Sequence, residues 1–252
     1  ECLSAFFTLI SRYAPIGIEG EGRDARLVLR FPGAGIEAEP PLPPSGALFL
    51  LLTLASVSFD GLSRTFFWLA LNDINPLEFP GRTALMTTNT LGLLATFAVL
   101  ATAYLAAIAL GQAMTHSQVT LRWAGGLFVW SIVPIALAYH FSHYLTVLLV
   151  NGQYAAVALS DPFAVGWNLF GTADMQVITG LTLGAEATWV VWNLQAGAIV
   201  GGHVLAVLVA HRIATRLHPE PMQAALSEAP LTVLMIAYTV FGLWLLSTPT
   251  GA

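Results

Sequence analysis

The sequence predicts an all-α integral membrane protein, a polytopic transmembrane helix bundle of about five membrane segments. Of the 252 residues, 56% are hydrophobic and only 9% are charged, whereas about a quarter of the residues in an ordinary soluble domain are charged. The mean hydropathy is +0.74. The apolar residues form long runs without Asp, Glu, Lys or Arg, and most runs exceed the roughly 20 residues that a helix needs to cross a bilayer.

The expected elements follow these runs along the chain. Residues 1-45 are expected to form an extramembrane connector with an apolar N-terminal stub, because the part after Arg12 is polar and rich in Gly and Pro. Membrane segments are expected at about 46-71, 83-112, 123-150, 188-212 and 230-247, with an outer loop at 151-187. The first segment either crosses as one helix to about Leu71 or breaks near Gly61. Pro134 has no N–H for the carbonyl of Trp130, so we expect a kink in the third segment.

The distribution of arginine predicts the orientation, because cytoplasmic connections of membrane proteins collect basic residues. The chain has no Lys. If the connector and the loops after the second and fourth segments lie inside, most Arg residues share that face. The inner set is Arg12, Arg23, Arg26, Arg30, Arg122, Arg212 and Arg216, against Arg64 and Arg82 outside. We therefore predict a multi-pass protein of the bacterial inner (plasma) membrane with residues 1-45 cytoplasmic and the C-terminus exterior.

Composition also limits the partners. The net charge is −5 and no basic patch occurs, which argues against nucleic acid and against an anionic lipid surface. The single cysteine, Cys2, excludes an internal disulfide and a Cys-based metal site. Because the chain starts at Glu1 and not like a signal peptide, we expect a processed protein or part of a longer one. The expected partners are the lipid bilayer and other membrane subunits or the missing remainder of the chain.

Three histidines in charge-free segments are the main candidates for function. His140 and His143 lie three residues apart, so they share a face of the third segment, and His203 lies in the fourth. Imidazoles inside a membrane are costly unless they have partners. Counting about 1.5 Å per residue from the outer face places His140, His143 and Gln195 at similar depths and His203 nearer the midplane. Asp60 lies in the same outer half if the first segment continues past Gly61.

These donors predict a metal site formed by His140, His143 and His203 with Gln195 or Asp60. Imidazole and carboxylate ligands suit Zn, Cu or Fe ions, and two histidines on neighbouring helices would also suit haem. A proton or substrate pathway would use the same residue types. A third possibility is a membrane metal-dependent hydrolase, in which the histidines activate water and Asp60 is the catalytic base.

Structural roles compete with these hypotheses. A histidine between membrane helices can simply form an interhelical hydrogen bond, as in a structural or accessory subunit. Asp60 and Arg64 are spaced i, i+4 and are expected to pair. His211 is expected to be interfacial at the cytoplasmic end of its segment. A surface of small residues on the fourth segment is expected to pack within the bundle; it comprises Gly197, Gly201, Gly202, Ala206 and Ala210.

Three stretches resemble a family of uncharacterised bacterial polytopic membrane proteins. They are residues 54–63 (LASVSFDGLS), 167–174 (WNLFGTAD) and 202–206 (GHVLA). Some members of this family are labelled fenitrothion hydrolase, and the resemblance covers most of the chain from the first segment onward. It implies a hydrolase activity as a hypothesis and assigns no catalytic residues.

Overall fold

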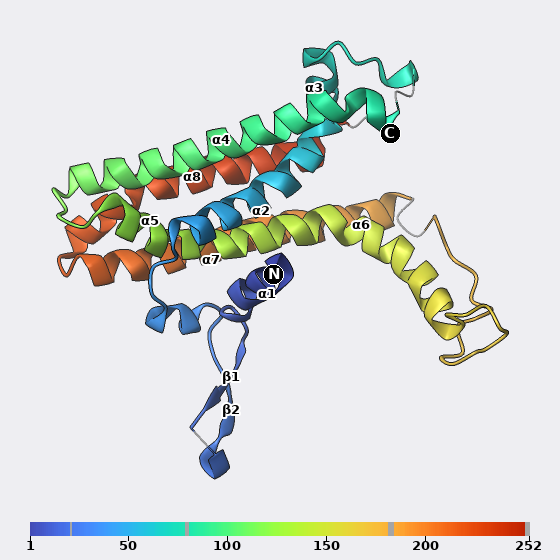
Figure 1. The fold of residues 1–252 in the computed structure, drawn as a ribbon, viewed down its shortest axis with the longest axis horizontal. Helices are drawn as coiled ribbons and strands as arrows, with labels where there is room; N and C mark the ends of the chain where they lie inside the picture. Colours follow the sequence, from blue (N-terminus) through green and yellow to red (C-terminus); the bar gives the residue numbers. More distant parts are fainter. Residues whose placement is uncertain (21, 79–80, 181–183, 250–252) are drawn as a thin grey trace.

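The computed structural model describes residues 1–20, 22–78, 81–180 and 184–249 and confirms the all-α bundle (Figure 1). Five stretches of helix are long and apolar enough to cross a membrane: Pro44–Ser63, Thr83–Met114, Leu121–Ser160, Ala185–Leu217 and Pro221–Ser247. They correspond in number and order to the five expected segments. The chain is therefore a multi-pass membrane protein by the length and apolarity of its helices.

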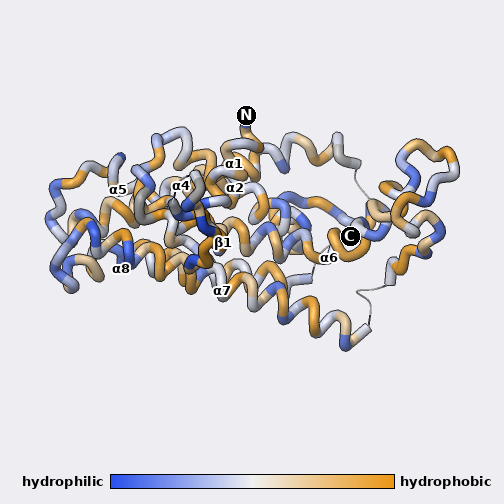
Figure 2. Tube along the Cα trace, turned by 90° about the horizontal axis from the view of Figure 1, so that it is seen from below, coloured by the Kyte–Doolittle hydropathy of each residue, from blue (hydrophilic) through white to orange (hydrophobic). Residues whose placement is uncertain are grey.

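The bundle has two ends that serve as reference points below. Consecutive spans run in opposite directions along the bundle (Figure 1). In chain order they are α2 (Pro44–Ser63), α4 (Arg82–Met114), the span from α5 to α6, α7 (Ala185–Leu217) and α8 (Pro221–Ser247). The α4–α5 and α7–α8 turns share one end, which we call the turn end; Asp60 lies near the other, the Asp60 end. Figure 2 shows hydrophobic residues along the helices and hydrophilic ones towards both ends of the bundle. Large apolar side chains such as Val99 (69% exposed) and Val233 (66%) face outward, as expected of surfaces that contact lipid.

The third membrane span is kinked, as predicted from Pro134. It consists of α5 (Leu121–Phe128), a 3-10 turn η4 (Val129–Ile132) and α6 (Val133–Ser160). The carbonyl of Trp130, which Pro134 cannot bond, accepts the N–H of Val133 and the hydroxyl of Tyr13 at 2.5 Å. The kink is thus stabilised by a side chain from the N-terminal region.

The first span ends by a break, which is one of the two expected alternatives. Helix α2 stops at Ser63, and a short helix α3 (Phe66–Leu71) follows. The side-chain oxygen of Thr65 accepts the N–H of Trp68 and so caps α3, a common helix start for threonine. The break leaves Asp60 in the last turn of α2.

The N-terminal region contains more structure than expected. It has a helix α1 (Cys2–Ser11), a hairpin of β1 (Ile16–Glu19) and β2 (Arg26–Leu29), and 3-10 turns η1 (Gly22–Asp24) and η2 (Ala34–Ala38). Helix α1 packs against α6, whereas the hairpin projects from the bundle (Figure 1). Leu42 donates its N–H to the carbonyl of Gly126 at 2.8 Å, which attaches the end of the connector to α5.

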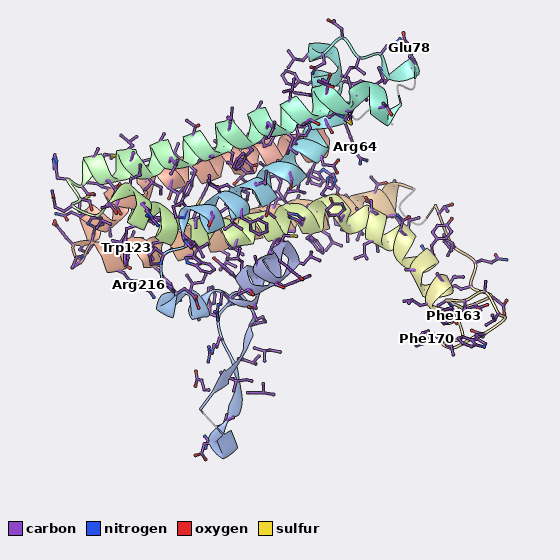
Figure 3. The ribbon with its side chains drawn as sticks, viewed as in Figure 1. Arg64, Glu78, Trp123, Phe163, Phe170 and Arg216 are labelled. Atoms are coloured by element: carbon purple, nitrogen blue, oxygen red, sulfur yellow. The ribbon has the colours of Figure 1, made fainter. Side chains whose placement is uncertain are left out.

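Helices α4 and α7 extend a few residues beyond the expected limits, and α6 and α8 extend by nine residues or more. Helix α6 continues to Ser160, and its last part bends away from the bundle into the loop that leads to α7; residues 181–183 of the expected outer loop lie outside the described residues. Phe163 and Phe170 in this loop are far from Arg64 at the end of α2 (Figure 3). Helix α8 starts at Pro221, nine residues before the expected start at 230, because Pro230 lies inside the helix. The span therefore includes Glu228.

Small residues let α7 approach α6 closely. A Cβ atom at Gly202 would lie 2.5 Å from the Cβ of Ala138, and Ala206 and Ala210 are fully buried. Packing within the bundle is thus confirmed for these three positions of the expected surface. The expectation of close packing is wrong for Gly197 and Gly201, because they lie on a different side of α7 from the packed face. A Cβ added at either glycine would meet no atom within 4 Å.

Candidate functional site

The structure brings Asp60 and His143 into direct contact across the boundary between α2 and α6. His143 Nε2 lies 2.5 Å from Asp60 Oδ2, so the ring nitrogen donates to the carboxylate. The side chains of His143 and Asp60 are 21% and 39% exposed. Such a short contact between a carboxylate and an imidazole is a charge-assisted hydrogen bond when the ring is protonated.

Asp60 is held from its own helix as well. The predicted i, i+4 pair with Arg64 forms, with Arg64 Nη2 3.7 Å from Asp60 Oδ1. The two carboxylate oxygens therefore have different partners, one a permanent cation and the other a titratable ring. This pair adds little stability by itself, because the arginine side chain is 62% exposed and exposed ion pairs contribute only about 0–1 kcal/mol.

The α6 side of the contact is fixed by neighbours of His143. Ser142 donates its hydroxyl to the carbonyl of Gln195 at 2.9 Å, and the Gln195 amide donates back to the carbonyl of Ser142 at 2.7 Å. This reciprocal pair joins α6 to α7 one residue before His143. The edge of Tyr144 packs on the His143 ring with centroids 4.8 Å apart. Gln195 thus has a structural role at the depth that the sequence predicted for it.

Two cavities border the Asp60–His143 pair. One, of about 490 Å³, lies between α2 and α4 and has Asp60, Ser63, Thr83, Asn89 and Thr90 among its lining residues. The other, of about 140 Å³, is lined by His143 and Arg64 together with residues of α7 and α8. The pair therefore lies between two cavities, one on the α4 side and one on the side of α7 and α8.

His140 takes part in a different contact. Its Nδ1 lies 2.7 Å from the carbonyl of Ala136, one turn earlier in α6. Its ring lies 5.8 Å from that of Phe6 in α1 and 6.2 Å from that of Tyr144, between centroids. The i, i+3 spacing with His143 is thus not used for a shared ligand in the structure.

His203 is buried deeper in the bundle, as the residue count predicted. It is 5% exposed, its Nδ1 lies 2.8 Å from the carbonyl of Ile199, and its Nε2 has no hydrogen-bond partner among the described residues. Its ring is 6.2 Å from that of Tyr139. The hydroxyl of Tyr139 donates to the carbonyl of Tyr238 at 2.7 Å, and the Tyr238 hydroxyl lies 2.5 Å from Ser58 Oγ.

The expected metal-ligand set does not assemble in the described part of the chain. No three His, Cys, Asp or Glu side chains there are placed to hold one ion. Of the predicted ligands, Asp60 and His143 meet, whereas His140 and His203 bond to their own helices. A metal ion or haem remains a prediction, and two adjacent donors do not fit the three protein ligands of a typical catalytic zinc site.

Sequence reasoning did not identify the tyrosine–serine contacts or a second acid–imidazole pair, His211 with Glu228. The expected last segment excludes Glu228 because the expected segments follow runs without charged residues, and the last run begins after Glu228. The signal that would have found it is Pro221, since proline is common at the first position of a helix and a helix starting there carries Glu228 into the span.

The chain has no match among protein-family profiles, curated proteins or solved structures. The resemblance to proteins labelled fenitrothion hydrolase therefore stays a hypothesis.

Proposed function

We propose that this chain is a proton-handling membrane protein in which His143 accepts and releases a proton and Asp60 positions its ring. The observation that carries the proposal is the 2.5 Å contact between His143 Nε2 and Asp60 Oδ2 at one end of a transmembrane bundle. Histidine is the side chain whose ordinary pKa lies nearest to physiological pH. An ionisable pair inside a membrane protein is a functional candidate by default.

The geometry defines the role of each nitrogen. Because Nε2–H donates to Asp60, the neutral ring carries its lone pair on Nδ1, for which no hydrogen bond is found among the described residues. A proton taken up at Nδ1 produces an imidazolium that the adjacent carboxylate stabilises, as in the His–Asp pair of hydrolases. Asp60 is then a positioning residue, whereas the sequence suggested it as the base.

The surroundings supply the route for the proton. The larger cavity reaches Asp60 from the α4 side, and the smaller one reaches His143 and Arg64 from the side of α7 and α8. The arginine distribution favours an orientation in which the turn end faces the cytoplasm and the Asp60 end faces the exterior. The proton would therefore exchange with the exterior at this end, either alone or coupled to a substrate.

A hydrolase is the second candidate, and the same base supports it. The Nδ1 of His143, beside the smaller cavity, could activate a water molecule without a metal ion. The resemblance to proteins labelled fenitrothion hydrolase points to the same class. A structural or accessory subunit is the third, in which the pair only joins α2 to α6.

The test is proton flux into vesicles that contain the purified protein and an internal pH-sensitive dye. Under an imposed pH gradient we expect wild-type protein to raise the flux above that of protein-free vesicles. His143→Gln should reduce this increment about 100-fold or more, the usual loss on removing a general base. His116→Gln is the matched control, since His116 is an exposed loop residue.

Two companion measurements separate the alternatives. Asp60→Asn keeps the shape of the side chain but removes the charge that positions the His143 ring, so it should reduce the flux increment while the purified protein stays folded. Wild-type flux equal to that of empty vesicles, with a His143 ring signal that does not titrate between pH 5 and 8 in nuclear magnetic resonance, would refute the proposal. Stoichiometric metal that is lost on His143→Ala would favour the metal-site hypothesis instead.

A further inference from the structure

A second carboxylate–imidazole pair joins α7 and α8 near the turn end. His211 Nδ1 lies 2.6 Å from Glu228 Oε1. The two side chains differ in their access to solvent: that of His211 is 55% exposed and that of Glu228 is 11% exposed. The imidazole therefore lies between the medium and a buried acid.

Glu228 has one oxygen without a partner. Its Oε2 is buried and makes no hydrogen bond among the described residues. A buried charged group with an unfilled hydrogen-bonding position is costly, and a neutral carboxyl is much less so. The environment thus favours an arrangement in which a proton can reach this acid.

Helix α7 carries two further cations near His211, Arg212 and Arg216, which take part in interactions of their own, and no described ion pair joins either of them to Glu228. Helices α4 and α2 offer no ion at this position. The α4 surface beside Glu228 is backbone, since a Cβ at Gly111 would lie 2.0 Å from the carbonyl oxygen of Ser227. Between Thr83 and Met114 the one ionisable side chain is Tyr104, whose hydroxyl donates to the carbonyl of Gly125. In α2, which also packs on α8, Asp60 lies at the opposite end. Of the described contacts, His211 is thus the ionic partner of Glu228.

The two acid–imidazole pairs lie on opposite sides of the span. Gln195 in α7 is level with Ser142, the neighbour of His143. His211 follows Gln195 by 16 residues (211 − 195) in the same helix, which corresponds to about 24 Å. The hydrocarbon layer of a bilayer is about 30 Å thick. Each pair therefore lies near one boundary of that layer.

We propose that His211 and Glu228 form a second proton-exchange site, which serves the membrane face opposite to the Asp60–His143 pair. This inference rests on the proposed proton-handling function. A proton from the medium binds His211 at Nε2, and the Nδ1 proton passes to Glu228 Oε1. The products are a neutral ring protonated at Nε2 and a neutral carboxyl, so charge and protons balance. Release is the reverse of these steps.

The experiment is infrared spectroscopy of the full chain in lipid while the pH is lowered from 8 to 5. We expect a protonated-carboxyl band to appear in wild type and to be lost in Glu228→Gln. Glu220→Gln, at the exposed start of the same helix, is the matched control and should keep the band. His211→Gln should move the midpoint of the band by about one pH unit or more, because it removes the exchanging partner. This second variant keeps the test decisive if Glu228→Gln does not fold.

The outcomes distinguish this inference from the function on which it rests. A band that persists in Glu228→Gln, or no carboxyl protonation in wild type over the whole range, would overturn the second site. If the wild-type protein conducts protons through His143 but shows no protonated-carboxyl band from Glu228, only the second site fails. If Glu228 titrates but neither His143 titration nor flux is seen, the proposed function fails.

Discussion

A paired glycine experiment tests how α4 and α8 pack. In Gly111→Ala the new Cβ would lie 2.0 Å from the carbonyl oxygen of Ser227. The helices would have to separate by about 1 Å, since Cβ atoms essentially never come within 3.0 Å of another heavy atom. Overpacking of this kind costs about 1–3 kcal/mol. In Gly201→Ala, by contrast, the Cβ meets no atom within 4 Å.

Both substitutions share the same intrinsic gain, because alanine in a helix is more favourable than glycine by about 0.5–1 kcal/mol. The difference between the two variants therefore isolates the packing cost. At about 2–4 °C per kcal/mol for a chain of this size, Gly111→Ala should melt about 2–12 °C below Gly201→Ala in detergent. Gly201→Ala should melt at or slightly above wild type. Equal melting temperatures, or the reverse order, would refute the close approach of α4 and α8.

Two further predictions concern regions outside the helix bundle. Tyr13→Phe removes the buried hydroxyl that donates to the carbonyl of Trp130, which Pro134 cannot bond. We expect a loss of about 0.5–1.5 kcal/mol in stability that shrinks in a Pro134→Ala background, and an equal loss in both would contradict the role of the kink. The N–H of Val165 and its neighbours lower the pKa of Asp161, so this carboxylate stabilises its loop above the ordinary pKa of about 3.9 and ceases to do so as the pH falls through its lowered value. Proteolysis of the loop should therefore accelerate below about pH 4 in wild type and in Asp174→Asn, but Asp161→Asn should remove this dependence.

The spans were predictable because the bilayer imposes a simple rule on the sequence. Long runs without charge identified all five, and Pro134 identified the kink. The start of α8 was not predictable by that rule, because the helix begins at Pro221 and carries Glu228, which interrupts the charge-free run. Counting residues along the chain located most ends of the spans to within about two turns; the exceptions are the end of α2, where Thr65 caps the next helix, the end of α6, which lies ten residues beyond the expected 150, and the start of α8.

The sequence predicted how deep in the membrane the candidate residues lie, but not which side of each helix faces its neighbour. Depth follows from residue counts, which brought Asp60 and His143 into the same half of the membrane. Which side of a helix meets which neighbour depends on packing that a single sequence does not encode locally. His140 and His203 accordingly turned to carbonyls of their own helices, and the glycine that meets another helix most closely is Gly111, outside the GxxxG spacing of Gly197 and Gly201.

The placement of ionisable groups follows the cost of burying charge. The two acid–imidazole pairs lie near the ends of the bundle, where water can reach one member of each. The interior between them has neutral groups, in which Tyr139 donates to a carbonyl and Tyr238 contacts Ser58. His203 lies in this interior, and its Nε2 has no hydrogen-bond partner among the described residues. Along α7 it is about 12 Å from Gln195 and about 12 Å from His211. Because apolar side chains could fill such positions at little cost in stability, the ionisable groups at the two ends of the bundle agree with the proposed proton-handling function.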